Sequence, residues 1–216
     1  MTKPRAFDLS VYFIVDPDLC LGRDISSVVA ASMRGGATLV QLRNKTGNKN
    51  QFLEQAKILK NILAGQVPLI INDDIEIAKA VGADGVHLGQ GDAPPQQARQ
   101  ILGAGAIIGQ TAFKESHFIK INPAIVDYAG TGPFYPTKTD KGKPVLGAMG
   151  FTSLVKISPV PVVGIGGITS ENAGSVIDAG ASGVAVMRDI SQAADPEIAT
   201  RRIALAVKNF RLKEAS

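Results

Sequence analysis

Two aspartates that follow neighbouring apolar runs of the chain could together hold a metal ion. Asp73 comes directly after the run at 68–71, and Asp92 comes shortly after the run at 85–88. If the two runs are adjacent strands of a parallel sheet, their carboxyl ends meet at one edge and the carboxylates converge. Carboxylates without accompanying histidine or cysteine suit a hard cation such as Mg²⁺. We therefore predict a magnesium site at Asp73 and Asp92; capping the next helix is the alternative for both, and it is the preferred role of Asp74.

Polar residues also follow the other apolar runs. In a parallel barrel the reactive groups lie just past the carboxyl ends of the strands. The residues at such positions are Gln41, Arg43, Lys45, Asn72, Gly89, Gln90, Gln110, Thr111, Thr137, Lys138, Thr139, Asp140, Lys141, Lys143, Arg188 and Asp189. Arg43 and Lys45 can both face the mouth because side chains alternate along an extended chain, although a solvated turn is the alternative. We expect these polar groups to gather at one end of the fold, which argues for a site more strongly than any single residue.

A glycine-rich turn follows the seventh apolar run, at Gly164–Ile168. Small residues let backbone N–H groups approach an anion, and the start of the next helix favours negative charge. Barrel enzymes often bind phosphate with the loops after strands seven and eight. We therefore predict phosphate binding here, against the alternative of a plain turn.

Nucleophilic catalysis has little support in the sequence. His87 lies inside the apolar run Val86–Leu88, which favours an interior histidine with satisfied hydrogen bonds over a catalytic one. His117 is expected on a short, exposed helix, and Cys20 has no histidine partner, so a structural thiol is favoured. A hydrolytic triad is therefore disfavoured, and a reaction driven by phosphate and metal electrostatics fits better.

Short runs rich in valine and isoleucine alternate with helix-like segments along the chain. The predicted strands are 11–15, 39–42, 68–71, 85–88, 106–108, 125–128, 161–165 and 183–187. The predicted helices are 25–34, 51–63, 75–81, 94–102, 116–121, 151–157, 171–179 and 196–210, with a long loop over 130–148. Continuous apolar strands are typical of a parallel sheet that helices cover.

Eight strand–helix units in 216 residues predict one domain, a (β/α)₈ TIM barrel over residues 1–216. The alternative is an open doubly wound sheet. That fold would need a glycine-rich fingerprint after the first strand, where the chain instead has Asp16-Pro17-Asp18.

Composition and charge limit the kinds of molecule that the protein is expected to bind and where it is expected to be found. The net charge is +4 and the basic residues are scattered, so nucleic-acid binding is not expected. No run approaches the ~20 apolar residues that span a bilayer. The polar start of the chain lacks a signal-peptide core, which favours the cytoplasm. A homo-oligomer is left open.

Several modest motifs follow one another along the chain in a specific order and spacing. They are Gln41-Leu42-Arg43-Asn44-Lys45, Ile71-Asn72-Asp73-Asp74, Asp84 to Gln90 followed by Asp92, Asp127 to Gly130, Gly132-Pro133-Phe134-Tyr135-Pro136-Thr137, Gly164 to Ile168 and Gly180 to Val186. Through these motifs the chain resembles the thiamine phosphate synthase family over about 12–190.

That family joins an aminopyrimidine methyl diphosphate to a thiazole phosphate and releases diphosphate. The resemblance implies that Asp73 and Asp92 hold Mg²⁺ on the diphosphate. It implies diphosphate contacts from Arg43, Lys45 and Asn72, which with Lys141 are the predicted catalytic residues. The other residues that it implies bind substrate are Gln41 at the pyrimidine, Thr111, and, at the thiazole phosphate, Thr137, Thr139, Gly167 and Arg188.

Two departures from the family pattern lie on the phosphate side. Asp140 occupies the usual lysine position, where Lys138 or Lys141 could substitute, and Arg188 occupies the position of a serine. They motivate one alternative, a phosphate-binding homologue that has lost turnover. The other alternative is a related thiazole tautomerase, which the resemblance disfavours because Pro133 stands where that relative has a histidine and because it would not need the paired aspartates.

Overall fold

Eight parallel strands close into a barrel in the order in which they occur along the chain. The computed structural model describes residues 6–139 and 142–214, so the predicted Lys141 and the Asp140 departure lie outside the described residues. The strands are β1 (Val11–Val15), β2 (Leu39–Leu42), β3 (Leu69–Asn72), β4 (Gly85–Leu88), β5 (Ile107–Thr111), β6 (Tyr128–Thr131), β7 (Val162–Ile165) and β8 (Gly183–Val186). The predicted TIM-barrel class is thus confirmed.

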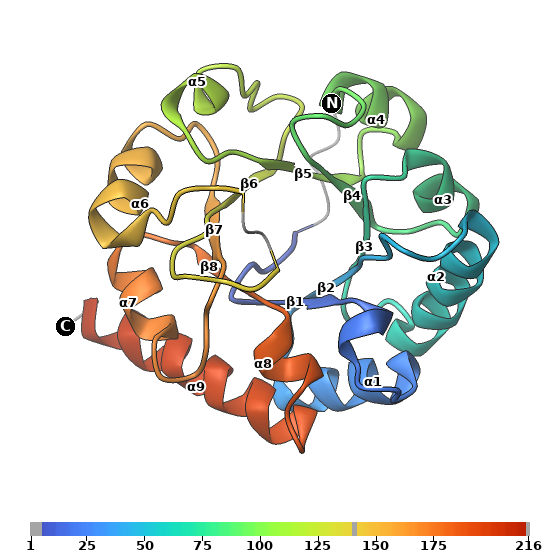
Figure 1. Cartoon of the computed structure of the whole chain (residues 1–216). Coiled ribbons are helices and arrows are strands. Elements are labelled where there is room, and N and C mark those ends of the chain that lie inside the picture. The colour runs from blue at the N-terminus through green and yellow to red at the C-terminus, as the bar shows by residue number, and fades with distance from the viewer. Residues whose placement is uncertain (1–5, 140–141, 215–216) are drawn as a thin grey trace.

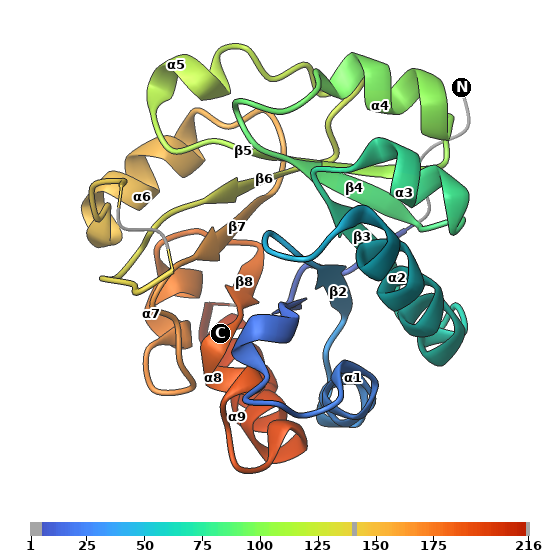
Figure 2. The ribbon, with the colours of Figure 1, turned by 45° about the vertical axis from the view of Figure 1, so that its right-hand side comes forward.

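Helices form a ring outside the strands, as Figure 1 shows down the barrel and Figure 2 from a second direction. They are α1 (Ile25–Gly35), α2 (Lys49–Leu63), α3 (Ile75–Ala80), α4 (Pro95–Leu102), α5 (Glu115–Phe118), α6 (Gly147–Lys156), α7 (Ala173–Asp178), α8 (Arg188–Ser191) and α9 (Pro196–Glu214), with a 3₁₀ turn, η1, at Pro17–Leu19. The long α9 packs against α1 and α7, which joins the end of the chain to its beginning.

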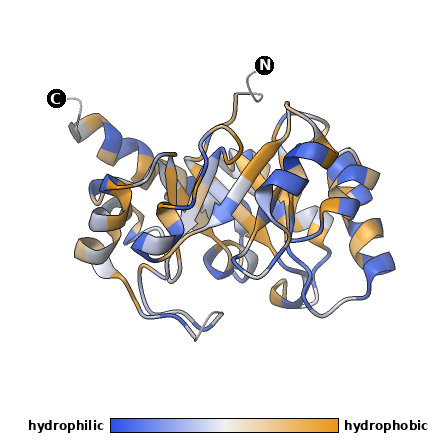
Figure 3. Ribbon diagram, turned by 90° about the horizontal axis from the view of Figure 1, so that it is seen from above, coloured by the Kyte–Doolittle hydropathy of each residue, from blue (hydrophilic) through white to orange (hydrophobic). Residues whose placement is uncertain are grey.

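Alternation along the strands divides the buried side chains into an inner and an outer core. The inner core fills the barrel and consists of Leu9, Tyr12, Ile14, Leu39, Ile70, Ile107, Tyr128, Val163 and Ala185. Alternate strand residues, such as Phe13, Val40 and Val86, point outward into a larger core under the helices. Figure 3 shows hydrophobic residues along the strands and a mixture of hydrophobic and hydrophilic residues along the helices. Burial on both faces explains why the strands are continuously apolar.

Side-chain caps fix where several helices begin. Asn48 and Gln51 form a reciprocal capping box at the start of α2. The Asp74 carboxylate accepts a hydrogen bond from the Ile77 N–H at 2.8 Å, so Asp74 is the predicted cap, of helix α3. This leaves Asp73 as the carboxylate of that pair that can serve a site.

Several strands and helices begin or end at other residues than predicted. The strand predicted at 125–128 lies three residues later, because the backbone N–H groups of Ile125 and Val126 bond back to Asn122 in a turn. Strand β5 extends beyond its predicted end to Thr111, and α6 begins at Gly147 rather than at Phe151. The short elements η1 and α8 were not predicted, because each is too short to show a helical period.

Cys20 and His117 differ in how well their predicted burial agrees with the structure. Cys20 is fully buried, and its Sγ lies 3.4 Å from the Asp16 carbonyl oxygen, as expected for a structural thiol. His117 is half-buried rather than exposed, because its ring packs edge-on against Phe113. Within residues 6–139 and 142–214, no helix is both long enough and apolar enough to cross a membrane.

Candidate active site

A cavity of about 870 Å³ opens at the carboxyl ends of the strands. Every predicted site residue that the structure describes lines it. These residues are Gln41, Arg43, Lys45, Asn72, Asp73, Asp92, Thr111, Thr137, Thr139, Gly167 and Arg188. The parallel barrel brings them together because all eight strands end on the same side. Their convergence is a finding, whereas their individual roles stay predictions.

The Asp73 and Asp92 carboxylates interact across the loops that follow β3 and β4. Partial burial and then the nearby Asp73 carboxylate raise the pKa of Asp92, which is the mark of two like charges held close together. Asp73 adopts a left-handed backbone, with φ of 63°, an uncommon conformation for a residue other than glycine. Asp92 is held in its loop by the Gly89 N–H, which donates to Oδ2 at 2.6 Å. The pair is an oxygen-donor set suited to a hard divalent cation.

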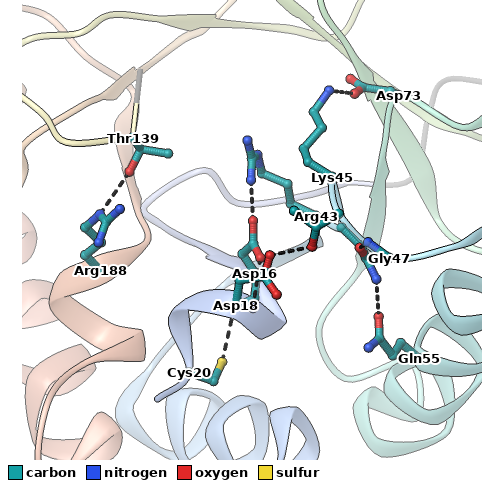
Figure 4. Close-up of polar contacts among 12 residues, drawn as sticks. Asp16, Asp18, Cys20, Arg43, Lys45, Gly47, Gln55, Asp73, Thr139 and Arg188 are labelled. Atoms are coloured by element: carbon teal, nitrogen blue, oxygen red, sulfur yellow. Dashed lines mark hydrogen bonds and ion pairs between the residues drawn. The ribbon is translucent and has the colours of Figure 1, made fainter. Parts of the chain in front are cut away.

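The cations after β2 are each paired with an acid, as Figure 4 shows. Lys45 donates to the Asp73 carboxylate, so it lies directly at the paired aspartates. Arg43 donates to Asp16, whose carboxylate is 4% exposed against 25% for the arginine. Asp16 also caps η1 by accepting from the Asp18 N–H. A buried acid thereby holds the Arg43 guanidinium at the wall of the cavity.

The glycine turn after β7 needs its glycines. Gly166 and Gly167 have φ of 99° and 66°, which disfavours any residue with a Cβ. A Cβ at Gly167 would also lie 2.6 Å from the Pro136 carbonyl oxygen and 2.7 Å from the Tyr135 Cβ. The turn therefore packs directly on the segment that carries Thr137 and Thr139, and both line the same side of the cavity.

Arg188 reaches across the cavity mouth from the first residue of α8 to that segment. Its Nε donates to the Thr139 hydroxyl oxygen at 3.0 Å (Figure 4). The Thr139 N–H in turn donates to the Thr137 hydroxyl oxygen at 3.3 Å. Arg188, the two threonines and the glycine turn thus surround one region, and they offer a cation, hydroxyl groups and backbone N–H groups to an anion.

His87 lies on the cavity wall and is fully hydrogen-bonded. Its Nδ1 is 3.0 Å from the Tyr128 hydroxyl oxygen, and its Nε2 is 3.0 Å from the Thr111 hydroxyl oxygen. Burial lowers the pKa of His87 to about 4, so the ring is neutral at physiological pH. This agrees with the interior, satisfied histidine expected from the sequence, although the ring also lines the cavity.

Sequence reasoning missed several residues of this cavity. Tyr12 lies inside an apolar run and His87 was expected in the interior, so neither was predicted as a site residue, and Asp16 counted only against a glycine-rich fingerprint after the first strand. Ser170, Glu171 and Arg202 also line the cavity and were not among the residues expected there. Period-two alternation along β1 and β4 could have placed Tyr12 and His87 on the inward face.

The cavity therefore has two chemically different sides. After β2 to β4 it offers two carboxylates, a lysine, an arginine and an asparagine. After β6 to β8 it offers a glycine turn, two threonines and an arginine. Such a site can bind two anionic groups in one space, one of them together with a divalent cation.

Comparisons with known proteins agree with this arrangement. A family model described as thiamine monophosphate synthase matches residues 11–190. A thiamine-phosphate synthase of Xanthobacter autotrophicus is 42% identical over 207 residues, covering 94% of this chain and 98% of that protein. One of Leptospira biflexa is 44% identical over 198 residues, covering 88% and 93%. The solved thiamine phosphate pyrophosphorylase from Pyrococcus furiosus superposes with a TM-score of 0.84 at 30% identity, covering 94% of this chain and 96% of that one.

Proposed function

The chain belongs to the thiamine monophosphate synthase family of transferases, and from that premise we propose that it joins an aminopyrimidine methyl diphosphate to a thiazole phosphate. The products would be thiamine phosphate and diphosphate. The observation that carries the proposal is the two-sided cavity, because one side suits a diphosphate with its metal ion and the other suits a phosphate monoester.

The diphosphate would bind on the side formed after β2, β3 and β4. Asp73 and Asp92 would hold Mg²⁺, and their convergence supports this because two nearby carboxylates favour a bound cation, while Lys45 contacts the Asp73 carboxylate and supplies a single positive charge to the pair. Among residues 6–139 and 142–214 no cluster of three or more metal-binding histidine, cysteine or acidic side chains occurs. Such a two-carboxylate set suits Mg²⁺, which is usually bound by one or two carboxylates together with substrate phosphates and water. Arg43, Lys45 and Asn72 would contact the same diphosphate.

The reaction needs charge stabilisation more than proton transfer. The bond from the pyrimidine methylene carbon to the diphosphate oxygen breaks, and the thiazole nitrogen donates its lone pair to that carbon. The nitrogen is already nucleophilic, so no general base has to activate it. When bound, Mg²⁺ supplies positive charge to the departing diphosphate. Arg43 and Lys45 add to it, and the cavity holds the two reactants in line.

The thiazole phosphate would bind on the opposite side, formed after β6, β7 and β8. The Gly167 turn would supply backbone N–H groups, and Thr137 and Thr139 would supply hydroxyl groups. Arg188 would stand in for the usual serine as a charged phosphate ligand, which its place beside Thr139 supports. Lys141, outside the described residues, stays a predicted catalytic contributor from the same loop.

The pyrimidine would lie between these sides, with Gln41 and Thr111 as its hydrogen-bond partners. Both residues point inward and line the cavity. A thiazole tautomerase is disfavoured, because Pro133 lines the cavity where that relative has a histidine and because the paired aspartates would have no use. The expected cytoplasmic location and the oligomeric state stay predictions.

The deciding experiment incubates the purified protein with both substrates and Mg²⁺ and follows thiamine phosphate. We expect turnover that needs all three components and stops with EDTA. Absence of product combined with measurable binding of the thiazole phosphate would contradict the proposal, and it would favour a phosphate-binding homologue without turnover.

A further inference from the structure

A chain of hydrogen-bonded side chains crosses the barrel at the floor of the cavity. The Gln41 Nε2 lies 2.5 Å from the Tyr12 hydroxyl oxygen, which lies 2.7 Å from that of Tyr128. Tyr128 contacts His87 Nδ1 at 3.0 Å, and His87 Nε2 contacts the Thr111 hydroxyl oxygen at 3.0 Å. The five side chains come from β2, β1, β6, β4 and β5. The chain therefore links opposite walls of the cavity without a break.

The barrel is built to make room for this chain. A Cβ at Gly109 of β5 would lie 2.1 Å from the Tyr128 ring and 2.5 Å from His87 Nδ1, so a side chain there would separate the two. A Cβ at Gly130 would lie 2.9 Å from the His87 ring. Tyr12 and Tyr128 are almost fully buried, and burial raises the pKa of both hydroxyl groups, so both keep their protons.

Counting donors and acceptors assigns a direction to each hydrogen bond between Gln41 and Thr111. The Gln41 Nε2–H donates to the Tyr12 oxygen, so the Tyr12 hydroxyl proton is left for the Tyr128 oxygen. The Tyr128 hydroxyl then donates to His87 Nδ1. A neutral imidazole has one donor and one acceptor, so Nε2 carries the proton and donates to Thr111. Every buried donor of the chain then has an acceptor, and the Thr111 hydroxyl proton is free to point into the cavity.

Only one other arrangement satisfies all these groups. If the Gln41 amide turns over, its carbonyl oxygen accepts from Tyr12, and every hydroxyl along the chain must reverse. His87 must then carry its proton on Nδ1, and the Thr111 hydroxyl must donate to Nε2. A mixture of the two arrangements leaves a buried donor or acceptor unpaired, which costs ~1–3 kcal/mol. Gln41, His87 and Thr111 are therefore coupled.

We propose that Tyr12, Tyr128 and His87 form a positioning relay that makes Gln41 present its carbonyl oxygen, and Thr111 its hydroxyl proton, to the ligand. An acceptor and a donor on facing walls match an aminopyrimidine whose exocyclic amino group donates to Gln41 and whose ring nitrogen on the opposite edge accepts from Thr111. A 4-oxopyrimidine, which has a carbonyl acceptor in place of the amino group, would require the whole chain to reverse. This inference rests on the proposed function, because it assigns the selectivity of the pyrimidine part of that site.

The first test measures the protonation of His87 within the relay and needs no substrate. The ¹⁵N chemical shifts of His87 in the labelled protein report which ring nitrogen carries the proton. We expect the Nε2–H form in the wild type and a mixture of both forms in Tyr128→Phe, where Nδ1 has lost its donor. A proton on Nδ1 in the wild type, or the same tautomer in both proteins, would overturn the relay.

The second test compares binding of two probes, the 4-amino-2-methylpyrimidine methyl diphosphate and its 4-oxo analogue, by calorimetry without thiazole phosphate. We expect the wild type to prefer the amino form by roughly tenfold or more. In Tyr128→Phe the Tyr12 hydroxyl can either accept from the Gln41 amide N–H or donate to the Gln41 carbonyl oxygen, so both orientations of Gln41 become accessible and the preference should fall to about threefold or less. Tyr135→Phe removes a hydroxyl outside the relay and should keep the wild-type preference.

The outcomes separate this inference from the proposed function. An unchanged amino preference in Tyr128→Phe overturns the relay while leaving the synthase proposal intact. If neither probe binds the wild type, the proposed function fails, and the His87 tautomers then decide the relay alone. If Tyr128→Phe does not fold, Tyr12→Phe replaces it in both tests, since it removes the hydroxyl group to which the Gln41 amide is hydrogen-bonded.

Discussion

Arg43, just past β2, donates a hydrogen bond to the buried carboxylate of Asp16, just past β1 (Figure 4). The acid comes from a different strand than the cation and has no predicted contact with substrate. It holds the guanidinium of the proposed diphosphate ligand in one place. A charged hydrogen bond of this kind contributes ~1.5–3 kcal/mol.

Asp16→Asn tests that arrangement. Asparagine can still cap η1, but it carries no charge for Arg43. We expect kcat/KM to fall about 10–100-fold, mainly through a higher KM for the pyrimidine diphosphate, with the KM for thiazole phosphate unchanged. Asp18→Asn is the matched control, because that exposed acid of the same turn bonds Thr46 instead of Arg43. Equal kinetics for the two variants would show that Asp16 does not position Arg43.

Asp73→Asn should remove the metal site while keeping the fold. The substitution leaves one carboxylate, Asp92, and we expect kcat to fall by about 100-fold or more, since a bound metal supplies several kcal/mol of charge stabilisation. A Mg²⁺ titration of the rate should also shift to higher concentration. Asp74→Asn is the control, because an asparagine preserves the cap of α3 and activity should stay near that of the wild type. A wild-type rate in Asp73→Asn would refute the metal role.

Gly167→Ala should damage phosphate binding as well as stability. A Cβ at φ of 66° costs ~1–2 kcal/mol and, in addition, meets Pro136 and Tyr135. We expect the KM for thiazole phosphate to rise about tenfold or more, the equivalent of one lost hydrogen bond to the phosphate. Gly22→Ala has a similar φ of 75° but no atom within 4 Å, so it should lose comparable stability and keep its KM. Matching KM values in the two variants would argue against a phosphate-binding turn.

Arg188→Ser restores the residue that the family usually has at this position. If Arg188 is a phosphate ligand, the variant should raise the KM for thiazole phosphate about 10–100-fold, the worth of a charge-assisted hydrogen bond. Arg201→Ser, which removes an exposed arginine that pairs with Glu197, is the control and should have wild-type kinetics. Activity that is equal or higher in Arg188→Ser would mean that the arginine merely occupies the place of the serine.

His87 should make the stability of the metal-free protein depend on pH. Burial lowers its pKa from 6.5 to about 4, so the folded state favours the neutral ring. Its contribution is fully present above pH 6.5 and is lost as the pH falls from 6.5 towards 4, by ~3 kcal/mol in total. Urea unfolding in EDTA should therefore show a steeper loss of unfolding free energy for the wild type than for His87→Asn. Parallel curves over this range would contradict the prediction.

Much of the fold and of the site could be predicted from the sequence, because the information is local. Short, continuously apolar runs such as 39–42 and 85–88 are what a strand buried on both faces requires. Once eight such runs are arranged in a parallel barrel, the loops that follow the strands must all lie at the same mouth, and Asp73, Asp92 and Arg188 on these loops line the cavity. The start of β6 was predicted wrongly, because a hydrogen-bonded turn at Asn122, and not hydropathy, determines where that strand begins.

Only the tertiary structure decided which side chains contact one another. Asp16 and Arg43 are far apart in sequence, and so are Tyr12 and Tyr128 or His87 and Thr111. Their contacts depend on the register of neighbouring strands and on the space that Gly109 leaves inside the barrel. Residue type and spacing thus determined what chemistry could collect at the mouth. Closure of the barrel determined the pairs that hold those groups in place, because the order and register of the strands in the closed barrel decide which inward side chains from distant parts of the sequence meet.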